Sequence, residues 1–313
     1  MFMEILSAVS KELGVNVNEL RRLSSVAPKK YKVYTIPKRQ SGFRLIAQPT
    51  SEIKRIQREV VKILASKLIV HDAAKAYKVS IGIKDNAKIH MANSYLLKMD
   101  FQNFFNKIKP ALLFDKLRSQ GVVLSGEDKE FLEGILFWKP GKKRSITLVL
   151  SVGAPSSPFV SNFVMYDFDN YINNWCSVRN ISYSRYADDI TFSTDEKNIL
   201  FEVPKVVRFA LSLCAKGISL NESKTVFTSK AHNRHVTGVT LTVDGELSLG
   251  RQKKRMISSL LHKYTLGLLA KEDVISLKGF VGHALYIEPK FIARMKIKYG
   301  KEVIHALFSE EGM

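Results

Sequence analysis

The order of apolar and polar residues predicts a chain built of both helices and strands. Apolar residues spaced three or four positions apart predict helices over 3–24, 52–69, 110–120, 127–138, 158–176 and 202–216. Runs of β-branched and aromatic residues predict two strands within 31–49 and others at 94–100, on both sides of 187–189, at 218–228 and at 234–249. The C-terminal part alternates helical patterns with basic positions. These patterns together predict the α+β class.

Positive charge is the unusual feature of the composition. The 313 residues include 49 Lys and Arg against 29 Asp and Glu, a formal net charge of +20. Charge on this scale attracts polyanions, so nucleic acid is the leading expected partner and a membrane surface is the weaker alternative. The sequence shows no internal repeat or long linker, so we expect domain boundaries to be seams between packed subdomains.

Other features of the sequence indicate the cellular compartment in which we expect the protein. No apolar run in the sequence reaches the roughly 18 residues that span a bilayer, and the first residues lack the pattern of a signal peptide. Cys176 and Cys214 lie far from any C-x-x-C pattern, which argues against a zinc site or a disulfide framework. We expect a cytoplasmic protein with no membrane partner.

The stretch SRYADDITFS, residues 184–193, has two adjacent carboxylates, Asp188 and Asp189, at the tip of a predicted hairpin. The turn contains no glycine, although a two-residue hairpin turn normally needs one. Like charges side by side also repel, and such departures from local preference are expected at functional sites. An isolated Asp-Asp pair is more often a solvated turn, so the interpretation depends on what accompanies it.

A third carboxylate, Asp100, closes the apolar strand in YLLKMD, where a buried strand would end near a cleft. Asp100, Asp188 and Asp189 would repel one another unless cations lay among them. Oxygen ligands suit Mg²⁺, and two such ions about 3.5–4 Å apart stabilise the attacking and leaving oxygens of an in-line phosphoryl displacement. We therefore predict that the three carboxylates hold two Mg²⁺ ions.

The segment LSVGAPSSP, residues 150–158, lies between these carboxylates in the sequence. Gly153 would let the backbone approach a ligand closely, and Ser156, Ser157 or Ser161 would cap the helix that follows. A helix N-terminus can receive a phosphate or a nucleotide, although an ordinary loop before a helix would have the same composition.

Residues 97–105, 150–158 and 186–189 resemble, in order and spacing, the three palm motifs of reverse transcriptases. The Tyr-Ala-Asp-Asp form is characteristic of that class. SGFRLIAQPTSEIKRIQ resembles the fingers motif that supplies a triphosphate-binding residue, here Arg44. GISLNESKT resembles the motif that follows the catalytic hairpin, with Lys224 as its lysine.

Two shorter segments narrow the resemblance to bacterial retron reverse transcriptases. NAKIH matches an N-A-x-x-H segment of these enzymes, with Asn86 and His90 as its outer residues. A second match is the Val-Thr-Gly signature before the thumb, formed by Val236, Thr237 and Gly238. The resemblance implies that all five residues bind RNA.

The resemblance also implies roles at the metals. Asp100 and Asp188 would bridge both ions with Asp189 assisting, and the backbone carbonyl of Phe101 would complete one coordination shell. Phe105 occupies the position of the bulky side chain that excludes a ribose 2′-OH, which would make the product DNA. Core packing is the alternative role for Phe105.

Further implied roles concern the nucleotide. Arg44 would pair with the triphosphate, which suits bidentate contact by a guanidinium. Lys224 would protonate the departing pyrophosphate, and Gly153 would lie against the nucleotide. The sequence departs from the family at Val152, where many relatives carry a glutamine that helps to position the incoming nucleotide.

A right-hand polymerase fold follows from the same resemblance. Fingers would cover 1–95 with a helical insert at 106–147, a palm of antiparallel sheet and helices would cover 96–240, and a helical thumb would cover 241–313. A basic loop at 139–145 and a basic stretch in the thumb would grip the RNA backbone; the thumb residues are Arg251, Lys253, Lys254 and Arg255.

The implied reaction is DNA synthesis from dNTPs on a cognate structured non-coding RNA that serves as template and primer. In retrons, synthesis begins at the 2′-OH of an internal guanosine, the RNA–DNA product stays joined, and an effector protein acts beside the enzyme in anti-phage defence. Two alternatives stay open: a reverse transcriptase of another bacterial class, such as a group II intron type, and a non-catalytic RNA-binding scaffold.

Overall fold

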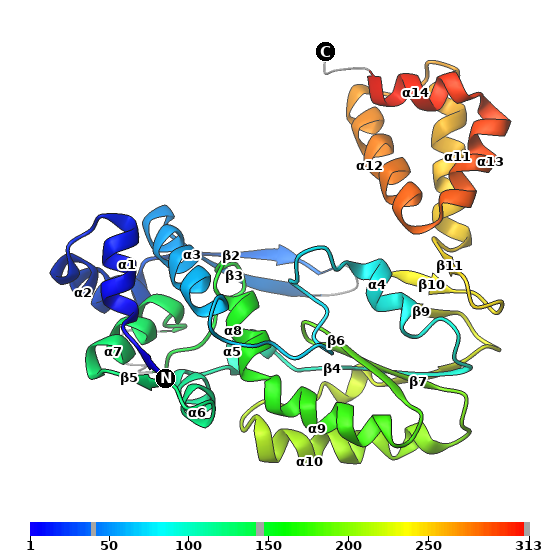
Figure 1. Cartoon of the computed structure of the whole chain (residues 1–313). Coiled ribbons are helices and arrows are strands. Elements are labelled where there is room, and N and C mark those ends of the chain that lie inside the picture. Colours follow the sequence, from blue (N-terminus) through cyan, green and yellow to red (C-terminus); the bar gives the residue numbers. More distant parts are fainter. Residues whose placement is uncertain (39–41, 142–146, 310–313) are drawn as a thin grey trace. The chain divides into compact units, whose positions relative to one another are not determined.

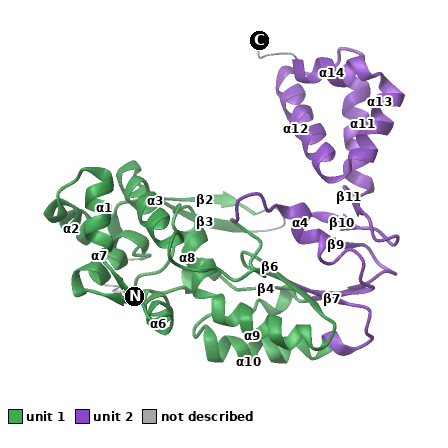
Figure 2. Cartoon of the chain, in the orientation of Figure 1, with its two compact units in different colours: residues 1–77, 98–190, 201–225 green, residues 78–97, 191–200, 226–313 purple. Residues whose placement is uncertain are grey.

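The computed structural model describes residues 1–38, 42–141 and 147–309, and Figure 1 labels its elements. These residues fall into two compact units, each drawn from three stretches of the chain (Figure 2). Unit 1 comprises residues 1–77, 98–190 and 201–225, and unit 2 comprises residues 78–97, 191–200 and 226–313. Both units contain helices and strands, so the predicted α+β class is confirmed. Most of the predicted basic loop at 139–145 lies outside the described residues.

Unit 1 begins with helices packed around a buried apolar core: α1 (Ile5–Leu13), α2 (Val17–Val26), α3 (Ser51–Ala65) and α7 (Gly126–Leu136). The prediction of one helix over 3–24 is wrong, because the chain breaks at Gly14, which adopts a left-handed φ of +63° and ends α1. Asn16 then caps α2, since its side-chain oxygen accepts a hydrogen bond from the Asn18 amide.

Short strands connect these helices. The two strands predicted within 31–49 are confirmed as the antiparallel pair β2 (Tyr31–Pro37) and β3 (Phe43–Pro49). A parallel pair, β1 (Phe2–Met3) with β5 (Val123–Leu124), brings the start of the chain beside a later segment. Trp138 forms a further isolated bridge with Val149.

The predicted acidic hairpin is confirmed as part of a sheet in which β6, β7, β4 and β8 follow one another; their bounds are β6 (Ser182–Tyr186), β7 (Asp189–Thr194), β4 (Tyr95–Asp100) and β8 (Val226–Ser229). The strand predicted at 218–228 is wrong over most of its length, because residues 222–224 form a 3₁₀ turn before β8.

Helices of unit 1 also accompany this sheet: α5 (Phe104–Lys107), α6 (Pro110–Ser119), α8 (Ser157–Val164), α9 (Tyr166–Ser177) and α10 (Val203–Cys214). The helix predicted at 158–176 is in fact two helices, α8 and α9, which meet at Met165. In Figure 1, α9 and α10 lie side by side, and Tyr171 of α9 packs against Phe209 of α10.

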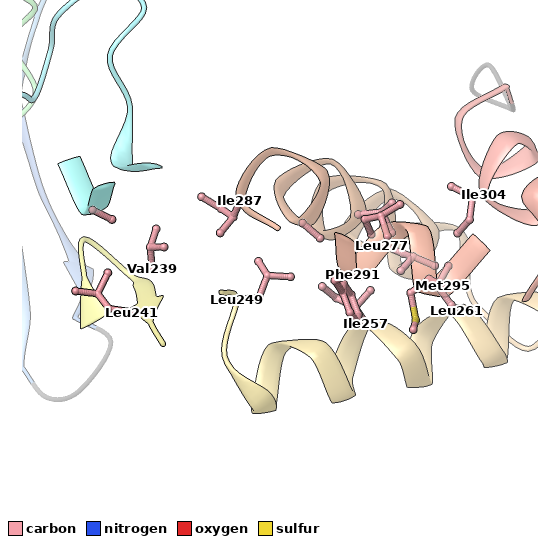
Figure 3. Close-up of a cluster of buried hydrophobic side chains, with 14 of the residues drawn as sticks. Val239, Leu241, Leu249, Ile257, Leu261, Leu277, Ile287, Phe291, Met295 and Ile304 are labelled. Carbon is pink, nitrogen blue, oxygen red and sulfur yellow. The ribbon is translucent and has the colours of Figure 1, made fainter. Parts of the chain in front are cut away.

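Besides β8 and parts of β4 and β7, unit 2 contains α4 (Ile83–Lys88), three short strands and four further helices. The strands are β9 (Arg234–Val236), β10 (Val239–Leu241) and β11 (Leu247–Ser248). The helices are α11 (Arg251–Thr265), α12 (Lys271–Ile287), α13 (Pro289–Tyr299) and α14 (Lys301–Ser309). Turns at 237–238 and 243–245 divide the single strand predicted at 234–249. Buried apolar side chains of these helices and strands form one cluster (Figure 3). No helix within the described ranges is long and apolar enough to cross a membrane.

Close packing of α2 against α7 provides a test of the unit 1 core. A Cβ added at Gly134 would lie 2.3 Å from the Ser24 carbonyl oxygen, which is backbone and cannot move without shifting α2. We predict that Gly134→Ala lowers the free energy of unfolding by roughly 1–3 kcal/mol, as overpacking does. Gly126→Ala, on the same helix with open space around the added atom, should be neutral or slightly stabilising in the same denaturant titration.

Candidate active site

Folding brings the ends of two strands together at the predicted carboxylates. Asp100 ends β4 and is buried. The amide of the next residue, Phe101, donates a hydrogen bond to the backbone carbonyl of Asp188 at 3.0 Å. Asp189 follows directly and begins β7. The structure therefore places Asp100, Asp188 and Asp189 in one site of unit 1.

The turn that carries Asp188 contains the strain expected from its sequence. Ala187 has a left-handed φ of +58°, a conformation that glycine would adopt without cost. Its carbonyl accepts a hydrogen bond from the buried guanidinium of Arg185 at 3.1 Å. A specific buried contact therefore supports the unfavourable backbone geometry at this position.

Burial and neighbouring negative charge raise the pKa of two of the three carboxyl groups, Asp188 and Asp189. Burial is the largest cause of the raised pKa of Asp188, and the charge of Asp100 adds to it. Burial, then Asp188 and then Asp100, raise the pKa of Asp189 to about 6. Burial is therefore the main penalty on the charged forms of Asp188 and Asp189, and the nearby carboxylates add to it.

Two basic residues compensate part of this charge. The Lys224 ammonium lies 2.9 Å from Asp100 Oδ2, and this hydrogen bond raises the pKa of Lys224. Arg44, on β3, is close enough to lower the pKa of Asp188, although its side chain is exposed. Both residues predicted to face the phosphates thus lie near the carboxylates.

The oxygen atoms of these three carboxylates are chemically suited to bind a divalent cation. Among the residues that the structure describes, no group of three or more His, Cys, Asp and Glu side chains is arranged to hold a metal ion, and Asp100 contacts Lys224 instead. Burial and nearby negative charge raise the pKa of Asp188 and Asp189, and a cation bound among these carboxylates would favour their charged forms. Carboxylate oxygens are the ligands that Mg²⁺ prefers.

A pocket of about 370 Å³ in unit 1 is lined by residues from four parts of the chain: Lys54 and Arg58 of α3, Tyr77, Phe105, and residues 151–155, 157 and 158. Phe105 is partly exposed there, whereas Phe101 and Phe104 are buried. The structure therefore separates the three phenylalanines: Phe101 and Phe104 pack in the core, and Phe105 faces the pocket.

The loop before α8 lies against β3. The Ala47 amide donates to the Val152 carbonyl at 3.0 Å, and the Ser151 hydroxyl donates to the Ala47 carbonyl at 2.6 Å. Gly153 has a φ of +120°, and a Cβ there would lie 3.2 Å from the Ala47 carbonyl oxygen. Glycine thus suits both the positive φ and the close approach to β3, and the residue also lines the pocket.

The predicted capping of α8 by a serine is wrong. Ser156 is the N-cap residue but its side chain makes no capping bond, and Ser161 donates to the Pro158 carbonyl at 2.9 Å. The hydroxyls of Ser156 and Ser157 are buried and have no hydrogen-bond partner within the described part of the chain. Pro158 in the first turn of α8 begins the helix without a side-chain cap.

Comparison with known proteins identifies the family. The family model described as "Reverse transcriptase (RNA-dependent DNA polymerase)" matches residues 36–241. The Retron Ec83 reverse transcriptase of Escherichia coli is 50% identical over 90% of this chain and 91% of its own length. The chain is a retron-type reverse transcriptase.

Two further similarities are more distant. The Retron Ec73 reverse transcriptase of Escherichia coli is 29% identical over 88% of this chain and 89% of its own length. A solved telomerase from Candida albicans, in complex with a fragment of telomeric RNA, has a TM-score of 0.48 and 14% identity, over 92% of this chain and 59% of the telomerase.

The family confirms several predictions made from the sequence. The chain is an RNA-directed DNA polymerase with the right-hand polymerase fold. Proteins of this family bind nucleic acid and generally use divalent metal ions. Of the alternatives left open by the sequence, the non-catalytic scaffold and the other bacterial classes are both set aside by the 50% identity to a retron enzyme.

The two segments that suggested a retron enzyme lie next to each other in unit 2. Ala87 of α4 packs in the same buried cluster as Val236 and Val239. The hydroxyl of Thr237 donates to the Ile83 carbonyl at 3.3 Å. Thr237 and Gly238 form the turn between β9 and β10 with positive φ angles of 47° and 81°.

Burial divides the predicted RNA-binding residues. The side chains of Asn86, His90 and Val236 are buried, whereas Gly238 is exposed and Thr237 is half-buried. His90 Nδ1 lies 2.8 Å from the Ser193 hydroxyl. RNA binding by the three buried residues stays a prediction, and in this structure it would have to act through the residues that they position.

The basic stretch begins α11. Arg251, Lys253 and Arg255 are exposed, whereas Lys254 pairs with Glu288 at 3.1 Å. Lys253 also donates to the Gly238 carbonyl at 3.4 Å. The first turn of α11 and the β9–β10 turn therefore form one surface of unit 2.

Sequence reasoning missed several residues of the candidate site. Lys54, Arg58 and Tyr77 line the pocket. Arg185 and Asp169 form a fully buried ion pair, and Arg185 also contacts the turn that leads into Asp188. Lys54 and Arg58 are four residues apart, which would have placed them on one helix face. The charged Arg185 in the middle of a strand was a signal as well, because buried charges are rarely unpaired.

The buried His90 provides a test of unit 2. Burial lowers the pKa of His90 to about 3, so the folded state disfavours a proton that the unfolded state accepts below about pH 6.5. We predict that acidification from pH 6.5 to pH 5 lowers the free energy of unfolding by up to about 1.4 kcal/mol per pH unit. His90→Gln should flatten this slope in denaturant titrations, and an unchanged slope would contradict the assignment.

Proposed function

We propose that this enzyme copies a cognate structured non-coding RNA into single-stranded DNA that stays joined to the RNA. Synthesis would begin at the 2′-OH of an internal guanosine, with the same RNA as template and primer and dNTPs as substrates. Membership of the retron reverse transcriptases supports this proposal, and a net charge of +20 suits a large RNA partner.

The observation that carries the proposal is the convergence of five predicted residues in unit 1. Asp100, Asp188 and Asp189 lie in one site, with Lys224 bonded to Asp100 and Arg44 near Asp188. The segments that supply these side chains are far apart in the sequence. A catalytic site explains why folding assembles like charges that would otherwise repel.

In the proposed mechanism, Asp100 and Asp188 would hold two Mg²⁺ ions, with Asp189 assisting and the Phe101 carbonyl completing one shell. Bound metal would stabilise the charge on the attacking and leaving oxygens of the phosphoryl transfer. The protein's own part is to hold the carboxylates rigidly, which the hydrogen bond between the Phe101 amide and the Asp188 carbonyl supports.

Basic residues would act on the phosphates. Arg44 is exposed near Asp188 and can offer bidentate hydrogen bonds to a triphosphate. Lys224 can give a proton to the departing pyrophosphate, and its ammonium already lies 2.9 Å from Asp100. When substrate or metal reaches Asp100, the bond from Lys224 would be exchanged for one to the phosphates.

The pocket would receive the incoming nucleotide, with Gly153 against it and Phe105 excluding a 2′-OH. Burial of Phe101 and Phe104 supports the choice of Phe105 among the three rings. Val152 directs its carbonyl to Ala47, so this loop would position the nucleotide through backbone contacts and not through a polar side chain at that residue.

The subdomain boundaries belong to the proposal as well: fingers 1–95 with the insert 106–147, palm 96–240 and thumb 241–313. Within the thumb, the exposed Arg251, Lys253 and Arg255 beside the Thr237–Gly238 turn would bind the stem-loop of the RNA. Lys254 would contribute less, because it already pairs with Glu288. Structured RNA is recognised mainly by shape and 2′-OH contacts, which suits a turn and a basic helix.

By analogy with retrons, the enzyme would work in the cytoplasm in anti-phage defence, beside an effector protein. This part of the proposal depends on the family alone. It predicts that the enzyme and its RNA–DNA product form the complex to which such an effector binds.

The first test of the function is the nucleic acid that the protein carries. The wild type, purified from its host, should contain RNA joined to DNA. Asp188→Asn with Asp189→Asn should contain the same RNA without DNA and should incorporate dNTPs at least a thousandfold more slowly, since about 4 kcal/mol of metal stabilisation would be lost. Sequencing the bound nucleic acid and measuring primer extension check both expectations.

A matched control removes two other carboxylates. Asp115 and Asp244 are exposed and lie outside the site, so Asp115→Asn with Asp244→Asn changes the net charge equally. This variant should retain the RNA–DNA product. Incorporation by the Asp188 and Asp189 variant within threefold of wild type would sink the two-metal assignment.

A second test concerns the sugar. Phe105→Ala should reduce discrimination against ribonucleotides by roughly 10–100-fold, because steric exclusion worth about 1–3 kcal/mol would be lost. Phe105→Tyr retains the ring and should preserve discrimination. Unchanged selectivity in single-nucleotide incorporation by Phe105→Ala would mean that another residue excludes the 2′-OH.

A further inference from the structure

Arg185 is fully buried, and its guanidinium donates hydrogen bonds to three different segments of unit 1. Its Nε and Nη2 donate to the two carboxylate oxygens of Asp169 on α9 at 2.8 and 2.6 Å. Its Nη1 donates to Asn162 Oδ1 on α8 at 3.0 Å and to the Ala187 carbonyl at 3.1 Å. The group therefore links two helices to the hairpin turn.

The bond to Ala187 acts on the peptide that leads into Asp188. That carbonyl belongs to the peptide plane joining the two residues, so the bond determines the orientation of the plane from which Asp188 begins. Ala187 has a φ of +58°, which alanine adopts at a cost. Without the guanidinium, the turn could relax to a less strained conformation and move the carboxylate.

The backbone of Arg185 holds a second part of the site. Its amide donates to the Ala73 carbonyl at 2.8 Å, and its carbonyl accepts from the Lys75 amide at 2.7 Å. Asn162, which Arg185 contacts, donates from Nδ2 to the Ala76 carbonyl at 2.9 Å. The next residue, Tyr77, lines the nucleotide pocket.

Stability alone does not account for this arrangement. A buried ion pair can often be replaced by apolar side chains of similar volume without loss of stability. What apolar side chains cannot provide is a fixed set of donors aimed at Asp169, Asn162 and Ala187 together. A lysine ammonium, as a point charge on a flexible stem, cannot reproduce the planar fork either.

We propose that Arg185 is a positioning residue for DNA synthesis: it holds the turn that presents Asp188 and the segment that presents Tyr77. This inference rests on the proposed role of Asp188 in catalysis. The guanidinium does not touch substrate in this arrangement and acts through the backbone of residues 187–188 and 73–77.

The test compares two variants with the wild type. Arg185→Lys retains the charge, and Arg185→Met with Asp169→Leu removes both buried charges so that the core can still pack. Both should lower kcat for dNTP incorporation at least tenfold and weaken Mn²⁺ binding, measured by calorimetry on the protein without nucleotide, at least threefold. RNA binding should stay within twofold of wild type, because the proposed RNA contacts lie at the Thr237–Gly238 turn and the start of α11.

Gly134→Ala is the control for a general loss of stability, since it strains the same unit at α2 and α7, away from the carboxylates. All variants are assayed well below their melting temperatures. If the Arg185 variants match Gly134→Ala in kcat and in Mn²⁺ affinity, Arg185 is merely structural and the inference is overturned. If one Arg185 variant fails to fold, the other decides.

The Asp188→Asn, Asp189→Asn variant distinguishes failure of this inference from failure of the proposed function. If it is inactive while the Arg185 variants behave as wild type, the inference fails and the proposed function stands. If it retains wild-type activity, the carboxylate assignment itself is wrong, whatever the Arg185 variants do.

Discussion

The buried ion pair between Arg185 and Asp169 is the interaction on which the rest of the site depends. It joins β6 to α9, holds the strained Ala187 through one hydrogen bond and reaches α8 through Asn162. A buried pair of this kind contributes little net stability compared with apolar packing. Its value is geometric, because a planar guanidinium with several partners allows one arrangement of the turn and few others.

The same arrangement brings together carboxylates that repel one another. Three carboxylates converge at the end of β4 and at the turn from β6 into β7, and burial together with nearby negative charge raises the pKa of Asp188 and Asp189. Lys224 and Arg44 offset part of the charge. A site assembled against repulsion in this way is poised for cationic ligands, since a divalent ion relieves a strain that the folded chain already carries.

Unit 2 shows how short sequence signatures can act through structure. Ala87 of the N-A-x-x-H segment packs in one cluster with Val236 of the Val-Thr-Gly segment, and Thr237 bonds to the start of α4. The buried residues of both segments thus support a turn whose exposed backbone lies beside the basic end of α11. In the proposed role in RNA binding, these segments would act mainly through this turn, because the side chains of Asn86, His90 and Val236 are buried.

The sequence by itself determined the α+β class, most helices and strands, the acidic hairpin, the family and the residues that converge at the site, because these depend on spacing and residue type along the chain. It did not reveal the break at Gly14, the division between α8 and α9, or the missing serine cap, because each depends on local backbone geometry that several sequences can share. The partners of Arg185 and the contributions of Lys54, Arg58 and Tyr77 to the pocket were decided by the tertiary structure. Such contacts arise when distant segments pack together, and no pattern within a single segment records which segment will lie opposite.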